Sequence, residues 1–388
     1  MQKKKVIVLG STGSIGLNTL KILKKQKKNF QIVLLSTNKN FKKVFKQAEE
    51  FKVKNIIISN YDYFIKAQKF NKHRFNIYNN FSQIKKLFKK KEIFYSMVAI
   101  VGLDGLKPSI LLSKYSKNLA IVNKEAIICG WYLIKSELLK YKTNFIPIDS
   151  EHYSIFSLLK NDSINNVKNF FITASGGPFL NTLKKNFHKI KLKDALKHPN
   201  WKMGKKISID SSTLMNKVFE VIEAKNIFSI NYNQIKVLIH SNSYIHAILH
   251  YKNGLIKLAA HEPDMKIPIM DSLNIIDNQF LKKKLINLNF LNKLDLRFVD
   301  IKKFPLITIL KSLPNKNSLY ETILITINDY YVEMFINKKI SYNQMVKSIY
   351  NACHLNEFLF YRSIKPKNVD EIYKLRDFVR LKLNLLSI

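Results

Sequence analysis

Apolar and polar positions follow one repeating arrangement through the first 125 residues. Short runs of β-branched and other apolar residues alternate with longer Lys-rich stretches. In stretches such as 17–27 and 42–51 the apolar residues recur every three or four positions, as in an amphipathic helix. Apolar strands that alternate with helices are typical of βαβ units and of a parallel sheet covered on both faces. The strands that we predict in this region and just beyond it are residues 6–9, 32–35, 55–58, 97–101, 119–122 and 145–148.

The pattern changes at about residue 149. Strand-like segments now recur between loops that are crowded with polar residues, which is typical of an α+β domain. Beyond about residue 290 the apolar spacing becomes helical. We predict strands at 170–173, 206–209, 237–239, 244–250 and 255–259, and helices at 304–313, 319–336, 342–351 and 369–386.

These elements predict an α/β protein in three parts. A Rossmann-like dinucleotide-binding domain covers residues 1–148, and a central α+β catalytic domain covers 149–272. A linker at 273–302 leads to a C-terminal α-helical bundle at 303–388. The length of 388 residues and the 46% of hydrophobic residues are enough for two or three cores.

The charge balance is strongly basic, with 66 Lys and Arg against 27 Asp and Glu and a formal net charge of +39. This excess raises the alternative of a nucleic-acid-binding protein. Only five of the 66 basic residues are arginine, so 61 are lysine. Arginine forms the bidentate fork that reads phosphates and bases best, so a selected nucleic-acid surface would rarely avoid it. We therefore expect a general drift in amino-acid usage and no specific nucleic-acid partner.

The two cysteines and the apolar runs indicate the compartment. Cys129 and Cys353 lie far apart and form no C-x-x-C pair, which argues against a disulfide framework and a thiolate metal site. No apolar run approaches the roughly 18 residues that span a bilayer. The first apolar strand begins by Val6, which leaves no room for a signal peptide. We expect a soluble cytoplasmic protein with no membrane partner.

A glycine-rich turn at residues 10–16, Gly-Ser-Thr-Gly-Ser-Ile-Gly, joins the first strand to a helix. Glycines let backbone N–H groups approach a pyrophosphate, and the helix N-terminus adds partial positive charge. The spacing differs from the usual G-x-G-x-x-G, so a purely structural turn is the alternative. The strand before it and the helix after it favour nucleotide binding.

The end of the second predicted strand indicates which dinucleotide binds. An NAD site places an acidic residue there, whereas residues 36–40 read Ser-Thr-Asn-Lys-Asn. The missing carboxylate favours the 2′-phosphate of NADP. Lys39 carries less weight, because it is one of 61 lysines.

Two carboxylates stand two residues apart where another predicted strand ends. Asp149 and Glu151 can both face one point there, and paired carboxylates repel unless a cation or a proton lies between them. Oxygen ligands suit Mg²⁺ or Mn²⁺. The alternative is that Asp149 or Ser150 caps the following helix, and locally the two interpretations are about equal.

A polar helix face follows at residues 211–220. Asn216, Lys217 and Glu220 lie three or four positions apart, so one face can present an amide, an ammonium and a carboxylate. With Ser211 near the start of the helix, these donors suit a phosphate, and Glu220 could complete a metal site. Glu223, one turn further, is expected to be a surface or interhelix charge.

Two loops complete the candidate site. Residues 198–204, His-Pro-Asn-Trp-Lys-Met-Gly, suggest a lid that lays the Trp201 indole over a small substrate. A tryptophan anchored in a domain interface is an equal alternative. Residues 175–179, Ser-Gly-Gly-Pro-Phe, form a tight loop whose hydroxyl and backbone N–H groups could bind a phosphate.

At this point the chain resembles the 1-deoxy-D-xylulose 5-phosphate reductoisomerase family. The matching strings occur in the family's order over some 260 residues, and the C-terminal third fits more loosely, through Asn328-Asp329 in place of Asn-Glu. The strings are GSTGSIG (10–16), NKE (123–125), DSEH (149–152), SGGPF (175–179), HPNWKMGKKISIDSSTLMNK (198–217) and EPDMKIPI (262–269).

The resemblance implies roles for individual residues. The metal ligands would be Asp149, Glu151 and Glu220. The catalytic residues would include Lys124, Glu151 and His198. Substrate would be bound by Ser150, Ser175, Trp201, Met203, Ser211, Asn216, Lys217 and Glu220. NADPH would be bound by Gly10, Thr12, Gly13, Ser14, Ile15, Gly16, Asn38, Lys39, Asn40, Asn123, Glu125 and Gly204.

The resemblance also implies the reaction. The phosphorylated sugar 1-deoxy-D-xylulose 5-phosphate would rearrange, most plausibly by retro-aldol cleavage and re-aldolisation, and NADPH would reduce the product to 2-C-methyl-D-erythritol 4-phosphate. This step belongs to the non-mevalonate route to isoprenoid precursors, and the family implies a homodimer. Lys124 would support developing negative charge on oxygen. The general base stays open between Glu151 and a metal-bound hydroxide. A metal-independent NADP dehydrogenase is the alternative enzyme.

Three departures from the family pattern affect packing rather than proposed ligands. Val218 replaces a helix glycine, Ser241-Asn242 replaces Pro-Gln, and His261 replaces the glycine before Glu-Pro-Asp-Met. We expect them to bear on stability more than on activity.

Overall fold

The chain divides into two compact units. The structure is a computed structural model and describes residues 2–201, 203–276, 292 and 294–386. The first unit comprises Met1–Ile127, Trp131–Asp149 and Met265–Lys283, and the second comprises Ile128–Gly130, Ser150–Asp264 and Lys284–Ile388. The predicted catalytic and helical regions thus share a unit, and the predicted three-domain boundaries stay a prediction.

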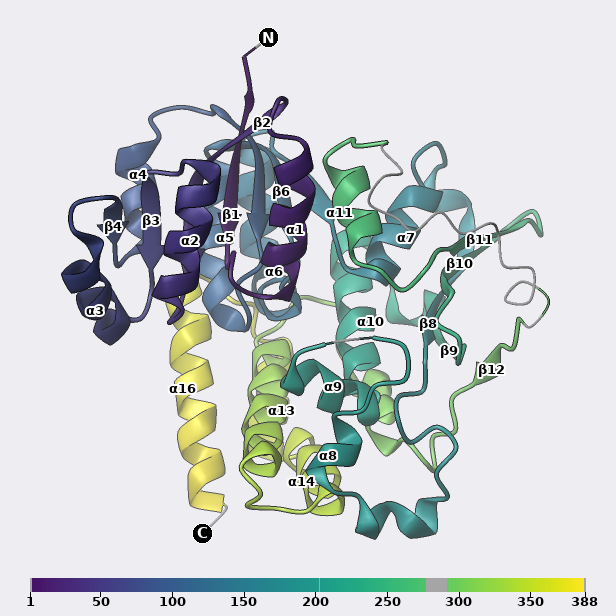
Figure 1. The fold of residues 1–388 in the computed structure, drawn as a ribbon. Coiled ribbons are helices and arrows are strands. Elements are labelled where there is room, and N and C mark those ends of the chain that lie inside the picture. The colour runs from purple at the N-terminus through teal and green to yellow at the C-terminus, as the bar shows by residue number, and fades with distance from the viewer. Residues whose placement is uncertain (1, 202, 277–291, 293, 387–388) are drawn as a thin grey trace. The chain divides into compact units, whose positions relative to one another are not determined.

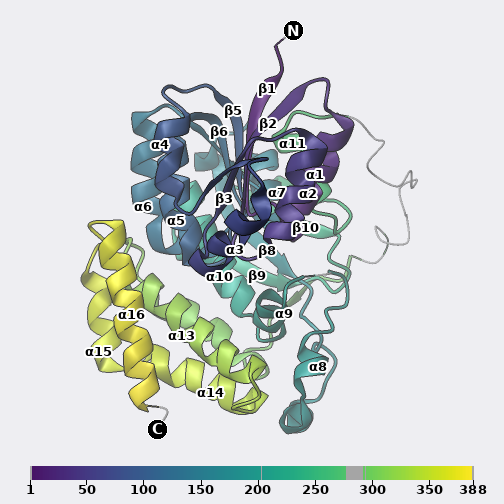
Figure 2. The same ribbon diagram turned by 60° about the vertical axis from the view of Figure 1, so that its left-hand side comes forward.

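The first unit is built on a parallel sheet of seven strands in the order β4-β3-β2-β1-β5-β6-β7. In Figure 2, α1, α2 and α11 lie on one side of this sheet and α4, α5 and α6 on the other. The strands are β1 (Lys4–Leu9), β2 (Phe30–Thr37), β3 (Asn55–Ile58), β4 (Asn76–Tyr78), β5 (Ile93–Val98), β6 (Ser116–Ile121) and β7 (Asn144–Pro147). The helices are α1 (Ser14–Lys25), α2 (Phe41–Phe51), α3 (Tyr61–Asn71), α4 (Ile84–Leu87), α5 (Leu106–Ser113), α6 (Lys124–Lys140) and α11 (Lys266–Ser272).

Strand β1 shows why this sheet is covered on both faces. Its residues Val6, Ile7, Val8 and Leu9 are all fully buried, although their side chains point alternately to the two faces. Burying a side chain of this size contributes roughly 1.5–3 kcal/mol. The continuous apolar run therefore explains the central place of β1, between β2 and β5.

The second unit contains a mixed sheet of five strands in the order β11-β10-β8-β9-β12. Helices α7 and α10 pack on one face of it through Ile155, Val221 and Ala224, which share a core with Phe170 and Ile172 of the sheet. The strands are β8 (Val167–Ala174), β9 (Ile235–Ile239), β10 (Ile245–Tyr251), β11 (Ile256–Ala260) and β12 (Arg297–Phe298). The helices of this part are α7 (Ser150–Leu158), α8 (Leu192–Ala195), α9 (Lys205–Ser212) and α10 (Met215–Phe228), with a 3₁₀ segment at Lys184–Lys189.

The C-terminal helices belong to the same unit. Helix α13 (Tyr320–Ile336) packs against α14 (Tyr342–Cys353), α16 (Val369–Leu386) and α9, and Figures 1 and 2 show α13, α14 and α16 together. Thirteen of the 17 residues of α13 are buried, because neighbours surround it. The short helix α15 (Asn356–Leu359) and a 3₁₀ segment at Pro305–Ser312 complete this part.

Comparison with the predicted elements confirms the α/β fold and corrects four details. Residues 206–209 are not a strand but part of α9, because the alternation of Ile207 and Ile209 with polar residues was misleading where Gly204 caps a helix. The strand predicted at 97–101 ends at Val98, and β4 was not predicted. Part of the predicted linker at 273–302 lies outside the described residues, and its end contributes β12 to the sheet.

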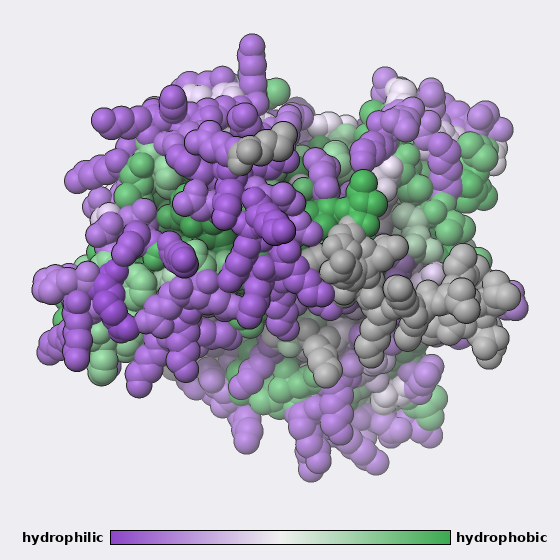
Figure 3. All heavy atoms as spheres, turned by 45° about the horizontal axis from the view of Figure 1, so that its top comes forward, coloured by the Kyte–Doolittle hydropathy of each residue, from purple (hydrophilic) through white to green (hydrophobic). Residues whose placement is uncertain are grey.

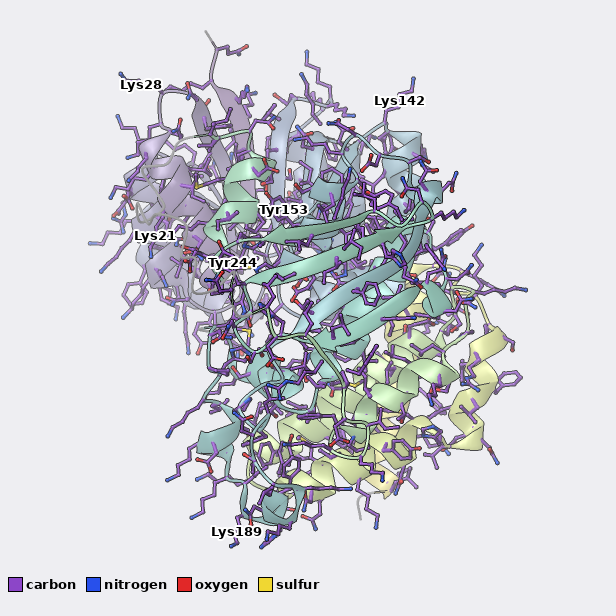
Figure 4. All side chains as sticks on the ribbon, turned by 90° about the vertical axis from the view of Figure 1, so that its right-hand side faces the viewer. Lys21, Lys28, Lys142, Tyr153, Lys189 and Tyr244 are labelled. Carbon is purple, nitrogen blue, oxygen red and sulfur yellow. The ribbon has the colours of Figure 1, made fainter. Side chains whose placement is uncertain are left out.

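One face of the molecule is largely hydrophilic. Figure 3 shows hydrophilic side chains over most of one face, with small apolar areas between them. Lys21, Lys28, Lys142 and Lys189 project outward in Figure 4. Within the described residues, no helix combines the length and the apolar character that a membrane crossing requires.

Candidate active site

The glycine turn of the first unit packs too closely for other residues at two positions. Gly10 has a φ of +75°, and a Cβ on it would lie 2.3 Å from the carbonyl oxygen of Ala99. A Cβ on Gly16 would lie 2.4 Å from the carbonyl oxygen of Gly10. Gly13 is less constrained, since its Cβ would lie 3.4 Å from the same oxygen. The turn therefore needs glycine at both ends, where it leaves β1 and enters α1.

The N-terminus of α1 is open to an anion. Gly13 occupies the N-cap and offers no side chain to the first-turn N–H groups, which begin at Ser14 and Ile15. The Thr12 hydroxyl lies 2.8 Å from that of Thr37 in β2, which fixes the turn against the neighbouring strand. Lys43 of α2 donates to the Thr12 carbonyl at 3.3 Å and adds positive charge beside the turn. This arrangement suits a pyrophosphate.

The three polar residues after β2 divide into two kinds. Asn40 is the N-cap of α2 and accepts from the Lys43 N–H at 3.2 Å, so its side chain has a structural task. Asn38 and Lys39 are exposed, and the Asn38 amide donates to the Ser59 hydroxyl at 2.9 Å. The carboxyl end of β2 is therefore followed by amide and ammonium donors, where an NAD site would carry an acidic residue.

The start of α6 holds three of the predicted residues. The Asn123 side chain accepts from the Ala126 N–H at 2.6 Å and donates to the carbonyl oxygens of Ile100 and Gly102. Asn123 thus ties the loop after β5 to α6, which is a structural role that the sequence did not indicate. Lys124 pairs with Asp149 at the end of this unit, and Glu125 is buried.

In the second unit, Lys217 lies at the centre of a buried ion cluster. Its ammonium contacts Glu151 of α7 at 2.5 Å and also pairs with Glu220, and all three residues are at least 92% buried. Burial opposes the charge on Lys217, but the attraction of Glu151 and Glu220 keeps its pKa above the usual value. The Asn216 amide donates to Glu220, as the predicted helix face requires.

Two carboxylates of the second unit meet at this cluster. Glu151 and Glu220 each pair with the Lys217 ammonium. Asp149 is joined directly to Ser150 of α7, so its distance from Glu151 follows from the chain itself. The Ser150 hydroxyl donates to Glu151 at 2.6 Å. Carboxylates with hard oxygen donors fit Mg²⁺ or Mn²⁺.

His152 of α7 and Glu223 of α10 lie next to the Lys217 cluster. His152 is fully buried, with Nε2 lying 2.8 Å from the carbonyl oxygen of Glu220. Its Nδ1 lies 3.9 Å from a carboxylate oxygen of Glu223, which is 1% exposed. Glu223 is therefore an interhelix charge between α7 and α10, and the surface alternative is wrong.

Ser175 and His198 form a second polar pair. His198 Nδ1 accepts from the N–H groups of Asn200 and Trp201 at 3.2 and 3.0 Å, so the ring proton is on Nε2. Nε2 then donates to the Ser175 hydroxyl at 3.0 Å, and Gly177 N–H donates to the same oxygen at 3.1 Å. Burial and the nearby Lys217 lower the pKa of His198 to about 4, so the ring is neutral. With both acceptor positions occupied, the Ser175 O–H can donate to a ligand.

The turn between α9 and α10 brings the remaining donors together. Ser211 lies in the last turn of α9, and Asn216 and Lys217 in the first turn of α10. Between them Leu214 adopts the left-handed conformation, with φ 60° and ψ 12°. This conformation costs about 1–2 kcal/mol for a residue with a Cβ, so the surroundings must hold the turn in place.

The predicted lid, residues 198–204, makes further contacts beyond the hydrogen bonds of His198. The Asn200 amide donates to the Ser241 carbonyl at 2.7 Å and the Ser243 hydroxyl at 2.8 Å. Trp201 is half-buried and packs edge-on against His246 at 6.2 Å. Met203 is half-buried, and Gly204, at the N-cap of α9, is exposed.

His261, one of the departures from the family pattern, stacks on His246. The ring centroids lie 3.9 Å apart and the rings are 21° from parallel. Tyr153 of α7 packs edge-on against His261 with ring centroids 5.9 Å apart, and Figure 4 shows Tyr153 and Tyr244 at the same end of the sheet. Burial and the neighbouring His261 lower the pKa of His246 to about 3. The histidine thus fills the space that a glycine would leave.

Sequence reasoning missed Lys43, His152, Asn200 and His246. Lys43 carries no signal in a chain with 61 lysines. His152 and Asn200 stand inside the matching strings, so their position was a usable signal. His246 lies in an ordinary apolar strand and could be found only from the fold.

Three family models match the chain. Residues 6–130 match "1-deoxy-D-xylulose 5-phosphate reductoisomerase". Residues 145–228 match its C-terminal domain, and residues 261–382 match a model described as "DXP reductoisomerase C-terminal domain". Together they cover most of the chain, including the C-terminal third where the sequence resemblance was loose.

Curated relatives and solved structures agree. The 1-deoxy-D-xylulose 5-phosphate reductoisomerase of Pelagibacter ubique is 50% identical over 387 residues, or 99% of this chain and 100% of that protein. The Clostridium tetani enzyme is 35% identical over 89% of this chain and 91% of its own. Among solved structures, the Zymomonas mobilis enzyme in complex with NADPH has a TM-score of 0.86 at 26% identity, over 99% of both chains. A DOX-P reductoisomerase in complex with NADPH, fosmidomycin and magnesium has a TM-score of 0.88 at 27% identity, over 99% of both chains. This chain therefore belongs to the 1-deoxy-D-xylulose 5-phosphate reductoisomerase family.

Proposed function

We propose that this chain converts 1-deoxy-D-xylulose 5-phosphate to 2-C-methyl-D-erythritol 4-phosphate with NADPH and a divalent metal. The observation that carries the proposal is the cluster around Lys217, where carboxylates, an amide and an ammonium converge in a buried place. A dehydrogenase that works without a metal has no need of such a cluster.

The metal would be held by Asp149, Glu151 and Glu220. A divalent cation there supplies Lewis-acid stabilisation of negative charge on substrate oxygens. Lys124 and Lys217 now neutralise these carboxylates, which otherwise repel one another. Carboxylates that converge in this way can share a divalent cation.

The substrate phosphate would be bound by Ser175, Ser211, Asn216 and Lys217. The neutral His198 ring holds the Ser175 oxygen and leaves its O–H to donate. This geometry favours a binding role for His198 over proton transfer, because a ring with a pKa near 4 is a weak base. Trp201 and Met203 would exclude water from the fragments formed on bond cleavage.

Lys124 and Ser150 would contact the hydroxyl end of the substrate. The Lys124 ammonium can support negative charge that develops on a substrate oxygen during retro-aldol cleavage. Glu151 accepts from both Lys217 and the Ser150 hydroxyl, so it is already fixed in position.

NADPH would bind at the glycine turn and the N-terminus of α1. The pyrophosphate would meet the open N–H groups of Ser14 and Ile15, and the 2′-phosphate would meet Asn38 and Lys39. NADPH supplies the hydride of the second stage. The NADPH contacts expected of Asn123, Glu125 and Gly204 stay predictions.

A turnover assay tests the function directly. Purified protein should oxidise NADPH with 1-deoxy-D-xylulose 5-phosphate and Mg²⁺ or Mn²⁺, and a chelator should stop the reaction. Folded protein without turnover would contradict the proposal. Activity that ignores the chelator would favour the metal-independent dehydrogenase.

We also propose a homodimer that forms through the outer face of the five-stranded sheet. The register places Phe171, Ile248 and Leu258 in one row on the face opposite α7 and α10. Leu258 is 43% exposed, and Phe298 of the edge strand is 78% exposed. Leu258 and Phe298 lie on the two edge strands of the sheet, exposed apolar side chains are common at protein interfaces, and Figure 4 shows no described helix over this face. Sedimentation should give a dimer, and Leu258→Lys should give a monomer.

The expected setting is the cytoplasm, without a nucleic-acid partner. Both cysteines are buried and no disulfide joins them, which suits a reducing compartment. The net charge of +39 supports weak binding to any polyanion, and such binding should disappear near physiological salt. A complex with DNA or RNA that persists at physiological salt would contradict this view.

A further inference from the structure

The two loops that we assign to the substrate phosphate pack directly on each other. Gly177 of the first loop has a φ of +65°, and a Cβ on it would lie 2.7 Å from the carbonyl oxygen of Ser211. The hydroxyls of Ser175 and Ser211 are therefore carried by two backbones in close contact. A small movement of either loop would change the distance between the two donors.

A single buried side chain of the C-terminal helices contacts both loops. The Tyr342 hydroxyl, in the first residue of α14, donates to the carbonyl oxygen of Ser212 at 2.8 Å. Its ring packs edge-on against Phe179, at the end of the 175–179 loop, with centroids 5.2 Å apart. Phe187 and Phe335 surround the same ring at 6.0 and 5.9 Å.

The hydrogen bond from Tyr342 lies at the C-terminal end of α9. Ser212 is the last residue of α9, where helical carbonyl groups lack partners within the helix. Two residues later Leu214 adopts the strained left-handed conformation, and α10 then presents Asn216 and Lys217. A strained turn persists only where its surroundings determine it, and the Tyr342 hydroxyl is bonded just before it.

Tyr342 is itself held firmly. It is 2% exposed, and Ser341 and Gln344 form a capping box that fixes the start of α14. Burial raises the pKa of the Tyr342 phenol well above its usual value, so the hydroxyl remains a donor at any physiological pH. The Tyr342 side chain is therefore held in one position, and its hydrogen bond to Ser212 is fixed.

We propose that Tyr342 is a positioning residue for substrate phosphate, and that it sets the spacing of the Ser175 and Ser211 loops without touching the substrate. The inference rests on the proposed function, because it takes these loops to be the phosphate site. It assigns the C-terminal helices a part in substrate affinity. The alternative is that Tyr342 only stabilises the fold.

Tyr320 provides a matched control. Its hydroxyl donates to the carbonyl oxygen of Cys353 at 2.6 Å, and its side chain is fully buried in α13 of the same unit. Tyr342→Phe and Tyr320→Phe each remove one hydroxyl and leave one buried carbonyl without its donor, so both should lower Tm by a similar amount. Only the first change is adjacent to the phosphate loops.

The experiment compares both full-length variants with the unaltered protein. Tyr342→Phe should raise KM for 1-deoxy-D-xylulose 5-phosphate, and the inhibition constant of inorganic phosphate, about fivefold to tenfold. Its kcat should stay within about twofold, because the phosphate does not react. KM for NADPH should not change. Tyr320→Phe should change none of these constants.

An unchanged KM in Tyr342→Phe, or an equal rise in Tyr320→Phe, would overturn the inference. If Tyr342→Phe does not fold, Phe179→Leu removes the ring contact from the other loop and keeps the Tyr342 hydrogen bond. It should raise the same two constants, and unchanged constants there would also overturn the inference. The proposed function fails separately, if the unaltered protein does not turn over the substrate.

Discussion

Removing the ammonium of Lys217 gives the sharpest test of the buried ion cluster. Methionine matches the unbranched shape of lysine and carries no charge, so Lys217→Met preserves packing. The change leaves Glu151 and Glu220 facing each other, at 8% and 1% exposure, without the cation that now lies between them. The protein must then bury uncompensated negative charge, or protonate one carboxyl, or bind another cation.

The expected cost follows from the burial of the cluster. Breaking a buried ion pair by removing one partner costs about 3–5 kcal/mol. A cation bound at about 100 times its Kd returns roughly 2.7 kcal/mol. In the presence of a chelator, Lys217→Met should therefore lose about 3–5 kcal/mol of unfolding free energy, and Mg²⁺ at about 100 times its Kd should restore roughly 2.7 kcal/mol of that loss.

Urea unfolding with chelator and with Mg²⁺ measures both quantities. Lys225→Met is the matched control, because Lys225 lies in the same helix and both lysines are 6% exposed. Lys225 donates to Asn317 at 3.3 Å instead of to the cluster, so its removal should cause no dependence on Mg²⁺. An equal Mg²⁺ effect in all three proteins would refute the reasoning.

The other predictions concern single groups. Glu220→Gln should lower kcat at least about a hundredfold and leave NADPH binding intact, as turnover and NADPH fluorescence titration would show. Gly16→Ala should weaken NADPH binding at least about tenfold, since its Cβ would meet backbone at 2.4 Å, whereas Gly13→Ala, with 3.4 Å available, should bind nearly normally. Asn38→Asp should reduce kcat/KM for NADPH about tenfold and spare NADH, because a carboxylate repels the 2′-phosphate. Burial keeps the pKa of His198 at about 4, against 6.5 for a free histidine, so the unfolded chain binds more protons between these values and stability falls as the pH drops through that window. His198→Gln should lose less stability than the unaltered protein over the same window, as measured by urea unfolding at each pH.

The sequence was most informative where local chemistry and periodicity agree. The apolar run at β1, the glycines at positions 10 and 16 and the polar face of α10 each follow from the residue types alone. The helices at 342–351 and 369–386 were also predicted nearly to their observed ends, because their apolar spacing is regular and Ser341 caps one of them.

The sequence was least informative where a side chain's role depends on distant partners. Asn123 suggested a cofactor contact, yet its amide holds the loop at Ile100 and Gly102. Tyr342 belongs to an ordinary amphipathic helix, and only the fold brings its hydroxyl to Ser212, 130 residues away. The false strand at 206–209 shows the same limit, because alternation cannot reveal the Gly204 N-cap or the neighbours of α9.

The place of Lys217 couples two ligands. One ammonium cannot serve Glu151, Glu220 and a phosphate at full strength at the same time. On the proposed assignment, a cation that takes over the carboxylates releases Lys217 to the phosphate, so it raises affinity for the substrate. Thermodynamic reciprocity then requires that the substrate raise affinity for the cation by the same factor. The cation and the substrate should therefore bind cooperatively. Each should bind more weakly alone than when the other is already bound.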